Sequence, residues 1–194
     1  MSQTNQDRKK EQNTQAEQGQ LNRAEIAQLV NEGAALLKRG QAQPALPSLR
    51  RAWELDPTEV ATAINLAGAY ILLNRHKEAI PVLESAVSLD PQNAMIWTNL
   101  GAAYLGNPIL ATPEKQDKAI QSFERALDLQ PGLSNMNYNL GLIYRDRKQW
   151  GQARDQFQRA LEVNPQDRDA KILWEEMVAR LAEELAQDEA EAEK

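Results

Sequence analysis

The 194-residue sequence contains no cysteine and a single histidine, His76. The absence of cysteine excludes disulfides, thiolate nucleophiles and cysteine-based zinc sites, although it leaves the redox compartment undecided. With one histidine, metal binding would rest on carboxylates, and their spacing matches no calcium-binding loop. The sequence also has no Gly-rich phosphate loop and no assembled nucleophile and base. We therefore predict that the protein is not an enzyme and needs no metal or other cofactor.

Long apolar runs are also missing. Nowhere do eighteen apolar residues follow one another, and the first twenty residues contain no apolar stretch as long as that of a signal peptide. We therefore expect a soluble, cytoplasmic protein with no membrane insertion. Lysine and arginine number 22 against 28 for aspartate and glutamate, and the resulting net charge of -6 repels phosphate backbones. Nucleic acid is thus not an expected partner.

Aromatic residues make up only 5% of the chain, whereas alanine, leucine, glutamine, glutamate and arginine are frequent. Few of these residues are β-branched, and the mixture favours helices over strands. The hydrophobic fraction of 42% is sufficient for a continuous core. The composition therefore predicts an all-α protein with one folded domain.

A short phrase recurs four times along the chain and has the features of a helix end. It reads AWELDP at 52–57, AVSLDP at 86–91, ALDLQP at 126–131 and ALEVNP at 160–165. Proline cannot continue a helix and biases the residue before it away from helical angles. The four prolines follow one another at intervals of 34, 40 and 34 residues. This spacing indicates a repeated structural unit, one copy of which carries six additional residues.

A second recurring phrase lies upstream of each of these endings. It reads NEGAAL at 31–36, NLAGAY at 65–70, NLGAAY at 99–104 and NLGLIY at 139–144. Leucine and tyrosine four residues apart fall on one face of a helix. The small residue after the leucine is expected to let a neighbouring backbone approach closely. Each unit is therefore predicted to be an antiparallel pair of helices.

These phrases resemble the tetratricopeptide repeat (TPR) family, whose 34-residue pattern has W, L-G, Y, A, F, A and P at fixed places. The third unit carries the full pattern, in Trp97, Leu100, Gly101, Tyr104, Ala119, Phe123, Ala126 and Pro131. The fourth unit departs from it at Asn137, and the first has Glu32 and Leu36 in place of leucine and tyrosine. The resemblance covers residues 26–167 and implies a right-handed superhelical solenoid of about four helical pairs.

The resemblance and the phase of the repeats together predict the domain organisation. We expect a TPR solenoid over 21–187, with units at 26–59, 60–93, 94–133 and 134–167 and a capping helix at 168–187. The cap would cover the last core face with one apolar side, formed by Ile172, Leu173, Met177, Leu181 and Leu185. Residues 1–20 nearly lack apolar side chains and are predicted to be a disordered tail, and 188–194 an acidic one.

The six additional residues fall within the segment GNPILATPEKQ, between the two helices of the third unit. Its glycine, asparagine and first proline break the first helix, and Thr112 with Pro113 can start the second. The turn is therefore predicted to have become a loop. Ile109 and Leu110 are two adjacent apolar residues in this loop, and they either fold back onto neighbouring helices or contact a partner.

In the TPR family the first helices of successive units line a concave groove, so the resemblance implies a partner-binding face there. The residue before the leucine position is an asparagine in every unit: Asn31, Asn65, Asn99 and Asn139. A carboxamide both donates and accepts hydrogen bonds and can bind a peptide backbone of any sequence. The alternative is that these amides brace neighbouring helices or bond the backbone. The other predicted groove residues are mostly apolar, namely Ile64, Gly68, Leu72, Thr98, Ala102, Tyr138 and Leu142.

The groove lacks the cations of the carboxylate clamp found in chaperone-binding family members. Its apolar lining favours an apolar segment or an amphipathic helix as the ligand. Arg145 is the inward-register cation that we expect to contribute, and the alternative is a surface residue paired with Asp146 or with the acidic cap.

We predict an adaptor or assembly factor that binds a protein or peptide. A self-associating scaffold, joined through the cap helix or the apolar groove into a homo-oligomer, is the second hypothesis, and an RNA-binding helical repeat is the third.

Overall fold

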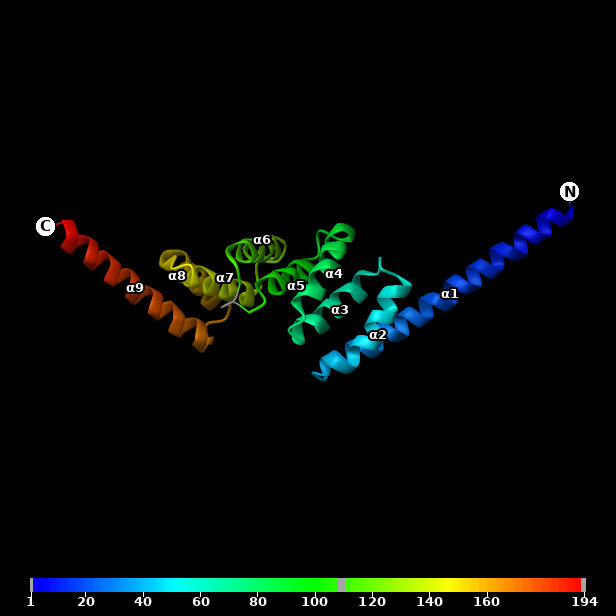
Figure 1. Ribbon diagram of the computed structural model, residues 1–194, viewed down its shortest axis with the longest axis horizontal. Coiled ribbons are helices and arrows are strands. Elements are labelled where there is room, and N and C mark those ends of the chain that lie inside the picture. Colours follow the sequence, from blue (N-terminus) through cyan, green and yellow to red (C-terminus); the bar gives the residue numbers. More distant parts are fainter. Residues whose placement is uncertain (1, 108–110, 193–194) are drawn as a thin grey trace. The chain divides into compact units, whose positions relative to one another are not determined.

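The computed structural model describes residues 2–107 and 111–192, and this part of the chain is helical with no strand. The predicted all-α class is therefore confirmed. The chain divides into two compact units, Met1–Leu89 (unit 1) and Asp90–Lys194 (unit 2). Figure 1 shows the helices of both in chain order. The division falls between the second and the third helical pair.

Unit 1 consists of two antiparallel helical pairs. Its helices are α1 (Ser2–Lys38), α2 (Ala42–Leu55), α3 (Val60–Leu72) and α4 (His76–Leu89). α1 packs against α2 and α3 against α4, and α3 also contacts both helices of the first pair. Three leucines are fully buried between these helices: Leu49, Leu66 and Leu83. Each belongs to a recurring phrase or lies one turn before it.

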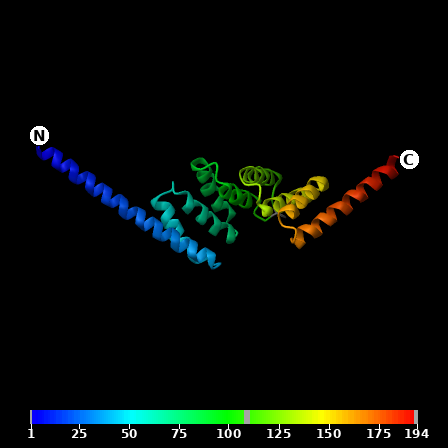
Figure 2. The same cartoon turned by 180° about the vertical axis from the view of Figure 1, so that it is seen from behind.

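α1 extends through the N-terminal segment for which the sequence predicts a disordered tail. The backbone is helical from Ser2 on, and Figures 1 and 2 show this part of α1 reaching beyond the other helices of unit 1. From residue 19 onward, the first buried side chain is that of Ile26. Glutamine, glutamate, lysine and alanine are good helix formers, and lengthening a formed helix needs no new nucleus. The lack of apolar residues in 1–20 therefore does not prevent a helix there.

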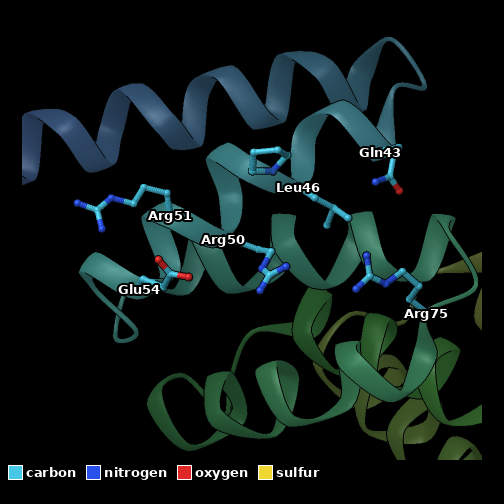
Figure 3. Close-up of a pocket in the computed structure, with 7 residues that line it drawn as sticks. Gln43, Leu46, Arg50, Arg51, Glu54 and Arg75 are labelled. Atoms are coloured by element: carbon cyan, nitrogen blue, oxygen red, sulfur yellow. The ribbon is translucent and has the colours of Figure 1, made fainter.

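The outward side of α2 carries a shallow pocket of about 360 Å³ (Figure 3). Leu46, Pro47, Arg50, Arg51 and Glu54 recur at helical spacing and so contribute to the pocket from α2. Arg75, in the turn between α3 and α4, completes the pocket.

Unit 2 contains two helical pairs and a terminal helix. Its helices are α5 (Ala94–Leu105), α6 (Pro113–Leu129), α7 (Ser134–Asp146), α8 (Trp150–Val163) and α9 (Arg168–Ala192). One apolar cluster joins the first of these pairs to α7 around Phe123 and Leu140. A second cluster lies between α8 and α9 around Phe157 and Met177. α9 therefore covers the last core face, which is the role predicted for the capping helix.

The predicted apolar side of this capping helix is only partly buried. Met177 is fully buried and Leu173 packs against the same cluster, but Ile172 and Leu185 are 62% and 64% exposed. Ile172 lies one residue before Leu173 and so points to another side of the helix. α9 has 25 residues, whereas α8 has 14, so Leu185 lies beyond the part of α9 that packs against α8. The helix continues into the acidic segment 188–194 as far as Ala192.

The second helices end as the recurring phrase predicts. Asp56, Gln130 and Asn164, each directly before a proline, have extended backbone angles with φ of -146°, -147° and -132°. At the first of these ends, the backbone N–H and the hydroxyl of Thr58 donate to Asp56 Oδ1 at 2.9 and 2.6 Å. These hydrogen bonds hold the pKa of the Asp56 carboxyl below its usual range.

The turns inside three of the four pairs share one geometry. Gly40, Asn74 and Lys148 occupy the same place after the first helix and have positive φ angles of 73°, 57° and 57°. In each, the next backbone N–H donates to the carbonyl five residues earlier, as Gln149 does to Tyr144 at 2.8 Å. This is the left-handed C-cap that glycine adopts without strain and lysine does not.

In the third pair the inserted segment replaces this turn. α6 begins at Pro113 with Thr112 at its N-cap, which confirms the predicted helix start. It has 17 residues, whereas α2, α4 and α8 each have 14. About half of the insertion therefore forms an additional helical turn of α6, and the rest lengthens the connection between α5 and α6, where the loop was predicted. Ile109 and Leu110 lie outside the described residues.

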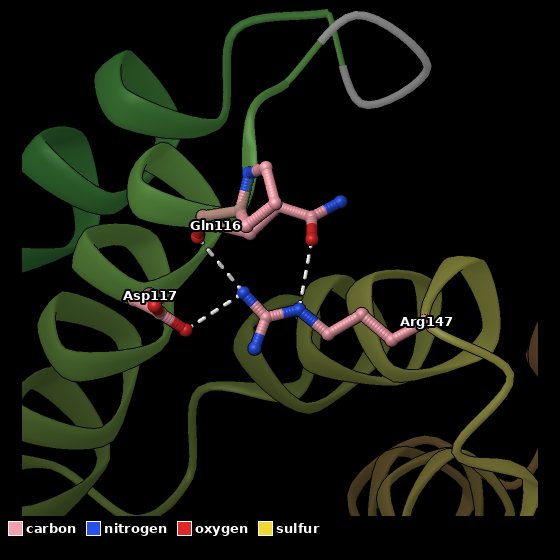
Figure 4. Close-up of polar contacts among 4 residues, drawn as sticks. Gln116, Asp117 and Arg147 are labelled. Atoms are coloured by element: carbon pink, nitrogen blue, oxygen red, sulfur yellow. Dashed lines mark hydrogen bonds and ion pairs between the residues drawn. The ribbon is translucent and has the colours of Figure 1, made fainter.

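Arg147, the residue that ends α7, binds this additional turn (Figure 4). Its Nε donates to Gln116 Oε1 at 2.8 Å, and its Nη2 donates to the carbonyl of Pro113 at 3.0 Å. The same Nη2 lies 2.7 Å from Asp117 Oδ1. Charge-assisted hydrogen bonds of this kind are short and directional, so Arg147 fixes the start of α6 against α7.

Candidate partner-binding site

The packing inside each pair determines which side of the first helix remains free. A Cβ added to Gly101 would lie 2.5 Å from the ring of Phe123, and one added to Gly141 would lie 2.6 Å from the ring of Phe157. The close neighbour is thus a side chain of the second helix and not a backbone, contrary to the prediction. Asn139 precedes Gly141 by two residues, or about 200° around the helix, and so lies on the side opposite the paired helix.

On unit 1, the predicted binding residues lie on α1 and α3, which contact each other. Asn31 is exposed, Ile64, Asn65 and Gly68 are half-buried, and Leu72 is 62% exposed. No atom lies within 4 Å of a Cβ added to Gly68. Because residues 64, 68 and 72 share one side of α3, Gly68 leaves a notch between two apolar side chains.

A shallow depression of about 280 Å³ lies beside Asn31, lined by Arg23, Ile26, Ala27, Val30, Asn31 and Glu59. The sequence did not lead us to Arg23, Ala27 or Glu59. Helical spacing back from Asn31 is the signal that could have found Arg23 and Ala27. Glu59 carries no such signal, because it reaches the depression from the N-cap of α3, where its carboxylate accepts a hydrogen bond from the backbone N–H of Thr62.

On unit 2, the predicted residues lie on α5 and α7 and are all half-buried: Thr98, Asn99, Ala102, Tyr138, Asn139, Leu142 and Arg145. The ring of Tyr138 meets that of Phe157 edge to face at 5.8 Å, and Leu142 packs against the same cluster. These two side chains therefore have one side in the core. Met95 was not predicted as a contact, yet it is 58% exposed one turn before Asn99.

The four repeated amides lack internal partners. In the described part of the chain, the side chains of Asn31, Asn65, Asn99 and Asn139 form no hydrogen bond, and none of the four residues is fully buried. Among the described residues, therefore, no side-chain hydrogen bond of these asparagines supports the alternative role of bracing neighbouring helices. The donors and acceptors of these amides stay available to solvent.

Two charged or polar side chains of α7, those of Arg145 and Tyr138, have identifiable surroundings. Arg145 Nη2 lies 3.4 Å from Asp146 Oδ1, which is the surface pairing that the sequence left open as an alternative. Burial raises the pKa of the Tyr138 phenol, with smaller contributions from Asp169 and Asp167. Tyr138 therefore stays neutral and presents a ring and a hydroxyl rather than an anion.

The described residues contain no group of three or more histidine, aspartate or glutamate side chains placed to hold a metal ion. His76 is half-buried at the first residue of α4. None of the described helices combines the length and the apolar character that a membrane-spanning helix needs.

Three tetratricopeptide repeat models match the sequence, over residues 36–103, 73–134 and 136–167. This chain belongs to the tetratricopeptide repeat family. The matches begin ten residues after the predicted start at 26, in the unit where Glu32 and Leu36 depart from the pattern.

Solved structures with the same fold include MamA, from residue 41 to its end, of Desulfovibrio magneticus RS-1. It is 26% identical to this chain, and the match covers 73% of this chain and 77% of MamA with a TM-score of 0.63. Pseudomonas aeruginosa PilF is 24% identical over 84% of this chain and 71% of PilF, with a TM-score of 0.69. A thermophilic TPR protein of Thermus thermophilus is 24% identical over 78% of this chain and 80% of its own, with a TM-score of 0.62. The last two show the fold alone.

The comparison with curated protein sequences finds no match. Family and structural neighbours together confirm the predicted all-α helical solenoid of TPR pairs. They support a role in protein interaction or as a scaffold, because repeat solenoids of this kind bind partners on extended surfaces. TPR proteins are generally adaptors or scaffolds rather than enzymes.

Proposed function

We propose that this TPR protein is an adaptor or assembly factor that binds an apolar or amphipathic segment of a partner protein on the free sides of its first helices. One observation supports this proposal above all. A solvent-accessible carboxamide without an internal hydrogen bond recurs at the same place of α3, α5 and α7, in Asn65, Asn99 and Asn139.

The recurring amides suit a ligand that is recognised through its backbone. Each amide is hydrated in the free protein, and a peptide N–H or C=O can replace that water at little net cost. Each such bond contributes about 0.5–1.5 kcal/mol. The amides would therefore fix the position of a bound segment, and two of them together would contribute about 1–3 kcal/mol to its affinity.

Further affinity would come from burial of apolar surface beside the amides. On unit 1, Ile64 and Leu72 flank the notch at Gly68, which can receive one apolar side chain of the ligand. On unit 2, Met95 lies one turn before Asn99 on α5. Burial contributes about 25 cal/mol per Å² of apolar surface. An amphipathic helix with apolar residues at three- and four-residue spacing matches such a lining.

A matched pair of double variants tests this proposal. The intact chain would first be used to capture its partner from native lysate, and the partner segment identified by mass spectrometry would be made as a peptide. Titration calorimetry would then compare Asn99→Ala/Asn139→Ala with Gln121→Ala/Gln158→Ala, whose two glutamines are exposed on α6 and α8. We expect about a tenfold or larger loss of affinity in the asparagine variant only. Equal affinities of the two variants would contradict the proposal.

A third variant addresses the apolar part of the same surface. Gly68→Leu would fill the notch on α3 without a clash at its Cβ, so circular dichroism should show unchanged helical content. The captured peptide should bind this variant more weakly than the intact chain. Undiminished binding would show that the ligand does not use the notch.

A further inference from the structure

The net charge of the chain is unevenly distributed between the two units. Unit 1 has ten acidic and ten basic residues, whereas unit 2 has eighteen acidic and twelve basic residues. The whole net charge of -6 therefore belongs to unit 2. Its acidic excess is concentrated in residues 181–194, which contain six acidic residues and one lysine.

The pocket on α2 is one place where unit 1 gathers positive charge. Three arginines, Arg50, Arg51 and Arg75, surround it with a single glutamate, Glu54. Figure 3 shows the side chains of Arg50 and Arg75 on the same side of α2, whereas Arg51 extends away from them. Leu46 lies between Arg50 and Arg75 but is only 4% exposed, so the exposed apolar residue of the lining is Pro47.

The cations of this pocket retain free hydrogen-bond donors. Arg75 is held in place, because its Nε donates to Glu78 Oε1 at 2.8 Å and its guanidinium lies 4.9 Å from the centre of the Tyr70 ring. Its terminal nitrogens are not used in that ion pair. Arg50 has no hydrogen bond or ion pair with any residue that the structure describes. A guanidinium group has five N–H donors in a planar fork that matches a carboxylate.

The C-terminal half of α9 has the complementary character. Leu181, Glu184, Leu185 and Asp188 recur at helical spacing and therefore share one face. Glu184 and Asp188 are exposed and form no ion pair within the described residues, and Leu185 is largely exposed. This face combines carboxylates with an apolar side chain, as the pocket combines guanidinium groups with the exposed Pro47.

We propose that the arginine pocket on α2 of one molecule binds the acidic C-terminal half of α9 of a second copy. Glu184 and Asp188 pair with Arg50 and Arg75. The contact joins two different surfaces and is therefore head-to-tail. Each added copy presents a free pocket on unit 1 and a free acidic helix on unit 2, so that association continues beyond a dimer.

This contact differs from the partner-binding surface of the proposed function. The pocket lies on a second helix, α2, whereas the amides lie on the first helices. Three of the groups that pair are exposed and Arg75 is half-buried, so the association should weaken strongly with salt. The screening length falls from about 30 Å at 0.01 M to about 3 Å at 1 M.

Sedimentation velocity of the full-length chain over a range of concentrations tests the proposal. At low salt the mean mass should rise with concentration past that of a dimer, and it should return to the monomer at about 1 M sodium chloride. Arg50→Glu alone and Glu184→Lys/Asp188→Lys alone should each remain monomeric. Lys77→Glu is the matched control, because Lys77 is exposed on α4 outside the pocket and its reversal changes the net charge of the chain as Arg50→Glu does. This control should associate like the unaltered chain.

Mixing the two defective variants provides the decisive measurement. The Arg50→Glu chain retains its acidic helix, and the Glu184→Lys/Asp188→Lys chain retains its pocket. Together they should associate, because the intact acidic helix of the first variant can bind the intact pocket of the second. A mixture that stays monomeric would overturn the proposal.

Three further results would also overturn it. One is an unaltered chain that is monomeric at every concentration in low salt. This is also the result expected if the pocket and the acidic helix paired within one molecule. Another is association of Arg50→Glu equal to that of the unaltered chain. The last is a loss of association in Lys77→Glu as large as that in Arg50→Glu, which would indicate net charge alone.

Discussion

The two units differ in the side chains that fill the space between the two helices of each pair. The difference concerns one position on the first helix and one on the second. In unit 2 a phenylalanine of the second helix lies against a glycine of the first, in Gly101 with Phe123 and Gly141 with Phe157. In unit 1 the second helix supplies a leucine instead, in Gly33 with Leu49 and Ala67 with Leu83. All four of these large side chains are fully buried.

This difference shows that the two places share one volume. The rings of Phe123 and Phe157 occupy the space that a methyl group would need on the first helix, and Leu49 does the same at Gly33, where a Cβ would lie 2.4 Å from it. In the remaining pair, the first helix carries the methyl group of Ala67 and the second helix has Leu83. Protein interiors are packed near the density of crystals, so adding a group at one place without removing one at the other creates strain. The effect of a substitution at either of these two positions on stability therefore depends on the residue at the other.

Loss of a phenylalanine should have the largest effect on this packing. Phe157→Ala should lower the free energy of unfolding by about 3–5 kcal/mol, because it removes a fully buried ring and leaves a cavity between α7, α8 and α9. Urea unfolding followed by circular dichroism measures the change. Gln158→Ala, at the exposed neighbouring position, should change stability by no more than about 0.5 kcal/mol.

The next largest effect should come from overfilling the same place. Gly141→Ala should destabilise by about 1–3 kcal/mol, although alanine is the better helix former. In a Phe157→Leu background, which reproduces the Ala67 and Leu83 combination of unit 1, the same substitution should cost little. Urea unfolding of the four chains in this cycle gives the coupling energy, expected at about 0.5–3 kcal/mol. A coupling energy near zero would contradict the idea of a shared volume.

The turns provide a smaller test of the same comparison. Lys148→Gly should stabilise the chain by about 1 kcal/mol, because Lys148 has a φ of 57° where unit 1 has Gly40. Thermal unfolding should show a higher midpoint for this variant and a lower one for the reverse substitution, Gly40→Lys. If neither midpoint moves, the left-handed turn does not strain lysine.

The smallest effect is expected at a glycine that packs against nothing. Gly68→Ala should raise the free energy of unfolding by about 0.5–1 kcal/mol, because a Cβ there meets no atom within 4 Å and alanine favours the helix. The sign is opposite to that expected for Gly141→Ala. Equal signs in urea unfolding would show that the space around the two glycines does not decide the outcome.

Much of the fold could be predicted, because it follows from local rules that act within a few residues. Proline after Asp56, Gln130 and Asn164 ends three helices, and Thr112 with Pro113 starts another. The free side of the first helices also follows from helical spacing, which places Asn65 and its counterparts opposite the paired helix.

Features that depend on distant residues could not be predicted in the same way. Arg147 binds Gln116 and Pro113 across more than thirty residues, and no spacing rule connects them. Glu59 reaches the depression on α1 through a turn. The composition of residues 1–20 indicated that they would not pack, but composition does not decide between a coil and an extended helix.

The contact between Arg147 and the additional turn of α6 has a consequence for protein engineering. TPR pairs are often regarded as interchangeable modules, each of which can be moved or duplicated as a block. Here the inserted turn belongs to the third pair, whereas the arginine that binds it belongs to the fourth. Transplanting the third pair alone would leave the carbonyl of Pro113 and the carboxylate of Asp117 without their cation. The smallest portable part that contains this insertion is therefore two pairs long.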